Sequence, residues 1–261
     1  NGAAAHDCIR VDTRSRGDGA GGISFDQRCV DLQVTCGRPD ICPEPIELVA
    51  QDGPAAAHEG GEQLIRSVAK TQGKLDFMFN NAGICIFGEV KNMTPDQWDR
   101  IIDINIKGVV NGTDVAYKIM CEQGSGHIVN TASGAGLMPI PLMTAYCMTK
   151  HAVVGLSTAL REEARRYNVK VSAICPGVIT TNIVNATESR DFDLKKMHAS
   201  SPVKEVPVTK AVTTILKEVA GNKAKIVFPR DIKITTKSYA ILPGAYSFLS
   251  QLGLKTVLKQ K

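Results

Sequence analysis

The residues with the clearest chemical potential in this 261-residue chain are Tyr146 and Lys150, which lie four positions apart. In a helix this spacing places both side chains on one face. A phenol with a pKa of about 10 is a weak base at neutral pH, and a nearby ammonium group favours the phenolate. Ser133 follows an apolar run upstream, and its hydroxyl could hold a substrate carbonyl oxygen beside the phenol. Together these residue types indicate proton transfer to or from an oxygen atom.

The segments around these residues alternate between strand and helix signals. Short apolar runs that end in turn residues predict strands at 75–79, 127–130, 169–175 and 225–228. Apolar residues at helical spacing predict helices at 61–72, 94–120, 145–167 and 210–220. The alternation predicts a single α/β domain, with a Rossmann-like, doubly wound parallel sheet between two helical layers. Ligands of such folds bind at the carboxyl ends of the strands, so the loops after each strand are expected to form the site.

Five ordered motifs resemble the classical branch of the short-chain dehydrogenase/reductase family. They are Asn80-Asn81-Ala82-Gly83, Asn105 in Asn105-Ile106-Lys107-Gly108, Ser133, Tyr146-x-x-x-Lys150, and Pro176-Gly177-Val178-Ile179-Thr180-Thr181. A lone Tyr-x-x-x-Lys pair is a weak signal, whereas five pieces in the family's order are specific. The resemblance covers about residues 61–228.

This resemblance implies an NAD(P)-dependent oxidoreductase that interconverts an alcohol and a carbonyl by hydride transfer. Tyr146 would be the general acid/base, Lys150 would lower its pKa and bind the nicotinamide ribose, and Ser133 would orient the carbonyl. Asn105 would anchor a water in a proton relay behind Lys150. The residues implied to contact NAD or NADP are Asn81, Ala82, Gly83, Tyr146, Lys150, Pro176, Gly177, Ile179 and Thr181. Asn80 fits a structural role instead, as a buried bridge between strands.

The first part of the chain departs from the family pattern. The family's glycine-rich turn, Thr-Gly-x-x-x-Gly-x-Gly, binds pyrophosphate at a helix N-terminus. The nearest stretch, 17–24, has Asp18 and Ser24 where the family has glycine, and the Asp18 carboxylate would repel pyrophosphate. Residues 10–16 are charged and lack a buried-strand pattern; 46–50 could be a strand, and Asp52 is a candidate for contacting adenine.

Three explanations for residues 1–58 stay open: a divergent cofactor half, a disordered tail, or out-of-frame translation joined to a genuine domain. Of the 13 aromatic residues only Phe25 lies in the first 76 positions, and four of the eight cysteines lie in the first 42, which favours the third. The predicted organisation is therefore an atypical segment at 1–58, a Rossmann-like catalytic domain at 59–235 and a tail at 236–261. The alternative function is a catalytically defective scaffold of the same family that cannot bind dinucleotide.

The composition and the cysteine spacing argue against nucleic-acid binding, a zinc site and secretion. The 31 basic and 26 acidic residues are nearly balanced, without long Lys/Arg runs, which argues against a nucleic-acid binder. The early cysteines lack the paired spacing of zinc ligands, so no metal site is expected. The first 42 residues hold no apolar run of the kind a secretory signal needs, which predicts a cytoplasmic protein with free thiols. Residue 1 is Asn, which allows a reading frame that begins further upstream.

Two segments are expected to shape the substrate site. The apolar loop at 134–143 and the stretch at 182–203 would line it, which favours a lipophilic alcohol or ketone; alternatively, the first loop packs on its own domain. His198 is expected at the surface.

In the tail, Pro243, Gly244, Gly253 and Lys255 argue against a membrane-spanning helix. The tail could cover the pocket, pack in an oligomer, or lie on a membrane with Lys255, Lys259 and Lys261 toward headgroups, and oligomer packing is preferred. The family resemblance implies homodimers or homotetramers, built on the helices that carry Asn105 and Tyr146.

Overall fold

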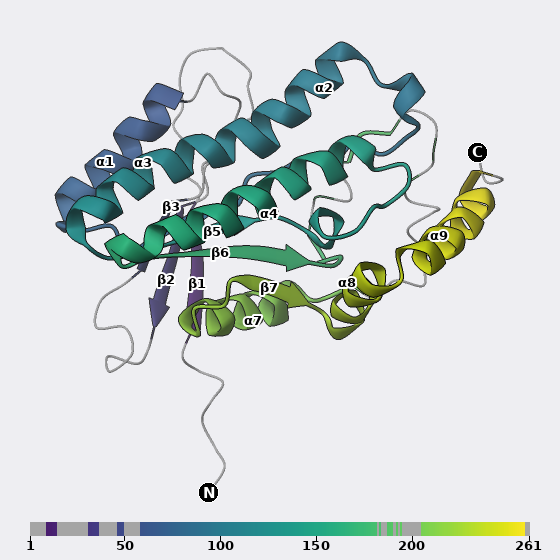
Figure 1. Ribbon diagram of the computed structural model, residues 1–261. Helices are drawn as coiled ribbons and strands as arrows, with labels where there is room; N and C mark the ends of the chain where they lie inside the picture. Colours follow the sequence, from purple (N-terminus) through teal and green to yellow (C-terminus); the bar gives the residue numbers. More distant parts are fainter. Residues whose placement is uncertain are drawn as a thin grey trace, which may run out of the picture.

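The core of the fold is a four-stranded parallel sheet with the order β4-β5-β6-β7 (Figure 1). The computed structural model describes residues 61–181, 183, 187–189, 192, 194 and 205–258, and the backbone alone of 9–14, 31–36, 46–49 and 58–60. The four strands are Phe77–Asn80, Gly126–Thr131, Val169–Pro176 and Lys225–Phe228. Each strand pairs with the next one along the chain, so helices cross over between them, as expected for parallel strands.

Helices cover both faces of this sheet. The α-helices of the described residues are α1 His58–Gln72, α2 Pro95–Ile102, α3 Gly108–Gln123, α4 Thr144–Ala164, α7 Val208–Ala220, α8 Arg230–Ile241 and α9 Pro243–Leu258. Met78 and Ile128 pack with α1, α3 and α4 on one face, whereas Val129 and Ile174 pack with α7 on the other. Successive strand residues thus feed opposite layers. The predicted three-layer α/β fold is confirmed.

The helix predicted at 94–120 is not continuous. Thr94 caps α2 through a reciprocal pair of hydrogen bonds with Gln97. A π-helical turn at Asp103–Lys107 then joins α2 to α3, and α3 ends at Gly124, whose φ of 70° suits glycine. The apolar pattern could not reveal this wide turn, because Ile101, Ile102 and Ile106 fit an uninterrupted helix.

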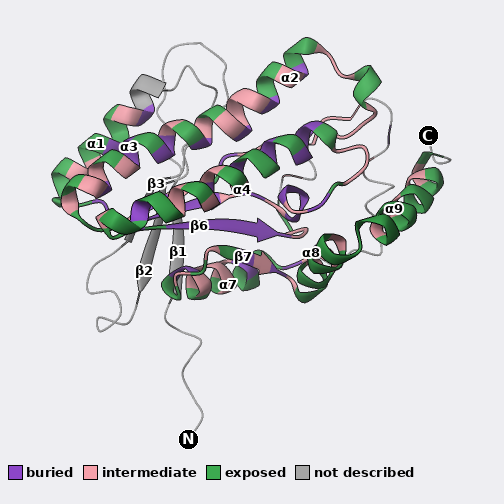
Figure 2. Ribbon diagram, viewed as in Figure 1, coloured by how far each residue is buried: buried purple, intermediate pink, exposed green. Residues whose placement is uncertain are grey.

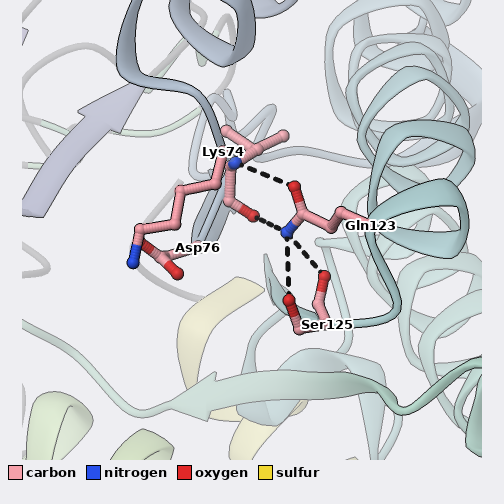
Figure 3. Close-up of polar contacts among 5 residues, drawn as sticks. Lys74, Asp76, Gln123 and Ser125 are labelled. Carbon is pink, nitrogen blue, oxygen red and sulfur yellow. Dashed lines mark hydrogen bonds and ion pairs between the residues drawn. The ribbon is translucent and has the colours of Figure 1, made fainter.

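The entry into β4 is fixed by the last residue of α3 (Figure 3). The Gln123 side chain accepts a hydrogen bond from the backbone N–H of Leu75 at 3.0 Å and donates to the Leu75 carbonyl at 2.8 Å. It also donates to the Ser125 carbonyl at 2.7 Å, and Lys74 pairs with Asp76 at 3.1 Å. One amide therefore ties the start of β4 to the start of β5.

The three strands before α1 form a separate antiparallel sheet, in the order β1-β2-β3. Their bounds are Ile9–Arg14, Asp31–Cys36 and Ile46–Val49. The strand expected at 46–50 is present at Ile46–Val49, in this antiparallel sheet. Residues 10–16 lack the pattern of a buried strand, and Ile9–Arg14 form an antiparallel strand instead. Ile9, Val11 and Thr13 alternate with charged residues, which is typical of an antiparallel strand with one polar face and not of a buried parallel strand.

The described chain ends in α8, which packs beside β7, and α9, which extends away from the sheet (Figure 1). Within the part that the structure describes, no helix has the length and apolar character needed to cross a membrane.

Candidate active site

Lys150 lies at the centre of the residues that the motifs predicted. It is 2% exposed, and its Nζ donates to the carbonyl of Thr131, at the end of β5, at 2.9 Å. A Cβ added to Gly83 would lie 3.1 Å from the same Nζ, so the loop after β4 passes directly over the ammonium group. Burial lowers the pKa of Lys150 from 10.5 to about 8. A buried cation thus lies where two strand ends and α4 meet.

Tyr146 lies one turn before Lys150 on α4 and is also buried. The Lys150 Nζ is 5.6 Å from the centroid of its ring. Burial raises the pKa of the phenol, the neighbouring Cys85 thiol adds to this, and a hydrogen bond with Ser133 acts in the opposite direction. In this structure the phenol therefore keeps its proton at neutral pH.

Ser133 follows β5 and begins the short turn Gly134–Gly136, where its hydroxyl accepts from the N–H of Ala135 at 3.2 Å. A Cβ on Gly136 would lie 2.5 Å from the carbonyl oxygen of Lys150. The turn that carries Ser133 thus packs directly on the α4 backbone at Lys150. This contact explains how Ser133 reaches Tyr146 from a different element.

Asn105 lies in the π-helical turn and is completely buried. Its Oδ1 accepts from the N–H of Ile84 at 2.8 Å, and its Nδ2 donates to the carbonyl of Ile84 at 2.9 Å and to the hydroxyl of Thr149 at 3.0 Å. Thr149 donates in turn to the Tyr146 carbonyl at 2.9 Å. Asn105 therefore connects the loop after β4 to the helix that carries Tyr146.

Asn80 has the structural role expected for it. Its Nδ2 donates to Asn130 Oδ1 on the adjacent strand at 2.7 Å and to Thr113 on α3 at 3.1 Å. A Cβ on Gly112 would meet Asn80 Oδ1 at 2.1 Å, so α3 approaches this bridge closely. Asn81, the next residue, is exposed and accepts from the Thr131 hydroxyl at 3.0 Å.

The proline-glycine loop after β6 lies at the same edge of the sheet. The N–H of Gly177 donates to the carbonyl of Phe228 at 2.8 Å, and a Cβ on Gly177 would lie 2.6 Å from Ile232 of α8. Ile179 forms an isolated parallel β-bridge with Val206, and the Thr181 hydroxyl accepts a hydrogen bond from the backbone N–H of Ile183 at 3.4 Å. The loop is thus held between α8 and the segment before α7.

The surroundings of Tyr146 are apolar and include two cysteines that sequence reasoning did not single out. Cys85 and Cys147 are buried in one cluster with Tyr146, and both thiols are free. Burial raises the pKa of Cys85 to about 12. Their positions in the sequence could have indicated that they lie near Tyr146, because Cys147 directly follows Tyr146 and Cys85 comes two residues after Gly83.

The loop at 134–143 contributes Ile140 and Met143 to this cluster, as well as Ala135. It also packs on its own domain, because the Leu142 carbonyl accepts from Gly88 at 2.8 Å. The expectation that this loop packs on its own domain is therefore confirmed, and its place in the substrate site stays a prediction.

Glu188, also missed, ties the segment after the proline-glycine loop to this region. Its backbone bonds Cys85 and Phe87, while its carboxylate accepts from Gln97 at 2.5 Å and pairs with Arg100 at 3.5 Å. Asp52, His198 and the stretch 17–24 lie outside the described residues, so those expectations stay open.

Comparison with known proteins identifies the family. The family model described as "short chain dehydrogenase" matches residues 46–191, more than half of the chain. The chain belongs to the short chain dehydrogenases.

Similar proteins and a similar solved structure are consistent with this family. An oxidoreductase of Thermotoga maritima is 29% identical over 84% of this chain and 91% of its own length. The oxidoreductase UcpA of Escherichia coli is 37% identical over 56% of this chain, and the match spans 54% of that protein. A short chain dehydrogenase/reductase of Burkholderia phymatum, solved in complex with NAD, superposes with a TM-score of 0.65 at 26% identity, over 72% of this chain and 73% of that chain.

Proposed function

We propose that this short chain dehydrogenase is an NAD(P)-dependent oxidoreductase that interconverts an alcohol and a carbonyl, with Tyr146 as general acid/base. The observation that carries the proposal is the convergence of Tyr146, Ser133 and Lys150 at one edge of the sheet, where Ser133 lies close enough to lower the pKa of the phenol and the Lys150 Nζ is 5.6 Å from its ring centroid. These are the groups that a proton transfer at a carbonyl oxygen requires. The NAD-bound relative supports a nicotinamide cofactor.

The residues around Lys150 fit such a cofactor. Its ammonium has three N–H donors, and among the described residues the Thr131 carbonyl accepts one of them, which leaves donors for ribose hydroxyls. Gly83 and Gly177 allow a close backbone approach, since a side chain at either position would meet Lys150 or Ile232. Ala82, Pro176, Ile179 and Thr181 would complete the contacts, with Asn81 beside the adenosine ribose. When bound, the nicotinamide supplies or accepts the hydride.

In the direction of reduction, Tyr146 donates its proton to the carbonyl oxygen. Burial keeps the phenol protonated at neutral pH, which is the form that this step requires. Ser133 holds the same oxygen by a hydrogen bond, and Lys150 stabilises the negative charge that Tyr146 acquires. Cys85, Cys147 and Ile101 keep water from the phenol and favour a lipophilic alcohol or ketone.

Asn105 acts in this scheme as a positioning residue. Both hydrogens of its amide are donated to protein groups, so a water of the proton relay would have to donate to Asn105, at its backbone carbonyl or at the second lone pair of Oδ1. π-Helical turns expose such groups and often occur at functional sites.

One observation favours the second candidate, a scaffold that cannot bind dinucleotide. The strands before α1 pair antiparallel in their own sheet, while within the described strands β4 has β5 as its hydrogen-bonded neighbour. In a doubly wound fold the pyrophosphate binds at the turn after the first parallel strand.

Cofactor binding separates the two candidates. The purified chain is mixed with NAD, NADH, NADP or NADPH, and its thermal unfolding and the nicotinamide fluorescence of the reduced forms are recorded. A stabilisation by at least one of the four supports the oxidoreductase. No effect of any of them would leave the scaffold as the function of this chain.

A further inference from the structure

The two C-terminal helices present an apolar surface that the rest of the described chain does not cover. The five most exposed large apolar side chains in the described residues all lie in or between α8 and α9; they are Ile241 at 76%, Leu249 at 66%, Phe248 at 65%, Leu242 at 62% and Ile234 at 55%. No residue of α9 is buried, and the helix is exposed along its length (Figure 2). Exposed apolar clusters of this kind mark an interaction surface.

The charge of this region is mostly positive. Asp231, in the first turn of α8, is its one acidic residue in the sequence, whereas lysines stand at 233, 237, 255, 259 and 261. Two copies meeting through this region would bring these lysines together with one acidic residue per copy. An anionic surface would instead attract every one of them.

The size of α9 suits a position in the plane of a membrane surface. Its 16 residues span about 24 Å, which is shorter than a bilayer core, and Lys255 lies within it. Helices that lie in this plane bury leucine and phenylalanine side chains at the boundary between headgroups and acyl chains, and α9 exposes such side chains beside one lysine.

A hydrogen bond connects α9 to the candidate active site. The Tyr246 hydroxyl donates to the Pro139 carbonyl at 2.7 Å, and its ring packs on Tyr239 at 5.1 Å between centroids. Pro139 belongs to the loop whose Ile140 and Met143 pack on the Tyr146 cluster. A surface bound by α9 would therefore lie next to that loop.

We propose that α8 and α9 bind an anionic lipid surface, with Phe248, Leu249 and Leu252 at the acyl boundary and the lysines at the headgroups. This differs from the preference for oligomer packing drawn from the sequence, and the reasons are the excess of lysines over acidic residues in α8 and the tail and the exposure of α9. Oligomers built on α3 and α4 would leave this surface free.

Vesicle flotation with the full chain tests the proposal. We expect binding to vesicles of phosphatidylcholine with phosphatidylglycerol, much weaker binding to phosphatidylcholine alone, and a loss of binding as salt is raised. The Phe248→Ser/Leu249→Ser variant should bind at least about tenfold more weakly. Lys233→Gln and Lys255→Gln should each weaken binding by about fivefold.

The matched control is Val90→Ser/Val110→Ser, which removes two exposed apolar side chains elsewhere and should bind like the parent chain. Unfolding midpoints of all variants show that each remains folded. Equal binding by the Phe248→Ser/Leu249→Ser variant, or no binding of the parent chain to anionic vesicles, would overturn the proposal. It would also be overturned by a parent homo-oligomer that Phe248→Ser/Leu249→Ser converts to monomers in light scattering, since the surface would then join two copies.

Discussion

Asn105 binds both backbone groups of Ile84, accepting from its N–H at 2.8 Å and donating to its carbonyl at 2.9 Å. The two bonds cross from the π-helical turn to the loop that follows β4, and that loop covers the Lys150 ammonium at Gly83. The same amide also donates to Thr149 of α4 at 3.0 Å, so it connects the predicted cofactor loop to the helix that carries Tyr146.

Replacing this amide should loosen the loop. Asn105→Ala leaves the N–H and carbonyl of Ile84 without their partner, which should lower the free energy of unfolding by about 2–3 kcal/mol in urea denaturation. The KM for the cofactor should rise as well. Asn111→Ala, a half-buried asparagine in α3, is the control and should change neither quantity. An Asn105→Ala chain as stable as its parent would show that the two bonds do not hold the loop.

Gly136 should tolerate no side chain. A Cβ there would lie 2.5 Å from the Lys150 carbonyl oxygen and 2.8 Å from its carbon, so Gly136→Ala must displace either the Ser133 turn or α4. We expect a loss of about 2 kcal/mol or more in stability, together with reduced turnover. Gly155 lies in α4, and no atom lies within 4 Å of a Cβ added to it. Gly155→Ala should therefore stabilise the protein by about 0.5–1 kcal/mol. Equal effects of the two substitutions would contradict the close packing.

The activity should depend on the charge of Lys150. Because burial lowers its pKa to about 8, the amine becomes neutral above that pH, and the phenolate of Tyr146 then lacks its stabilising cation. The kcat/KM for carbonyl reduction should therefore fall about tenfold per pH unit above pH 8. Lys150→Arg, whose charge persists, should be slower overall but lack this decline. If the kcat/KM of Lys150→Arg declined in the same way above pH 8, the decline would arise from the titration of a group other than Lys150.

His127 should make the fold sensitive to acid. It is buried on β5, with Nε2 2.8 Å from the Ser172 hydroxyl, and burial lowers its pKa from 6.5 to about 4, with Lys170 and Arg161 acting in the same direction. Between these values the unfolded chain binds more protons than the folded chain, so stability falls as pH falls. The loss attributable to His127 should be about 3 kcal/mol.

Urea denaturation of His127→Gln at several pH values measures this contribution. The variant should lose less stability than the parent between pH 6.5 and 4. Parallel curves for the two proteins would show that the pKa of His127 is the same in the folded and the unfolded chain, which would contradict the lowering by burial.

The sequence was most informative where local signals and packing agree. Ser133, Tyr146 and Lys150 could be placed together because they follow β5 or lie on one face of α4, and parallel strands bring those ends to one edge. The π-helical turn could not be foreseen, since it depends on a tertiary contact between Asn105 and Ile84. The contacts of Glu188 are likewise formed by residues about 90 positions apart, such as Gln97.

The pKa of Tyr146 also depends on features that no motif carries. A charged neighbour such as Lys150 predicts a lowered value, but burial and Cys85 act against it in this structure. The pKa of Tyr146 is raised in this structure, and its lowering by Lys150 stays a prediction. The antiparallel pairing of β1 with β2 could not be predicted either. In β1, apolar residues alternate with charged ones, and such a composition is also typical of loops.

Turnover by Tyr146→Phe is the most direct test of the proposed mechanism. The substitution removes only the hydroxyl, so binding of the nicotinamide cofactor, followed by thermal shift, should persist. Oxidation of the reduced cofactor by a panel of lipophilic ketones, followed by nicotinamide absorbance, should fall at least about a hundredfold relative to the parent chain. Turnover at the parent rate by Tyr146→Phe would contradict the assignment of Tyr146 as the general acid.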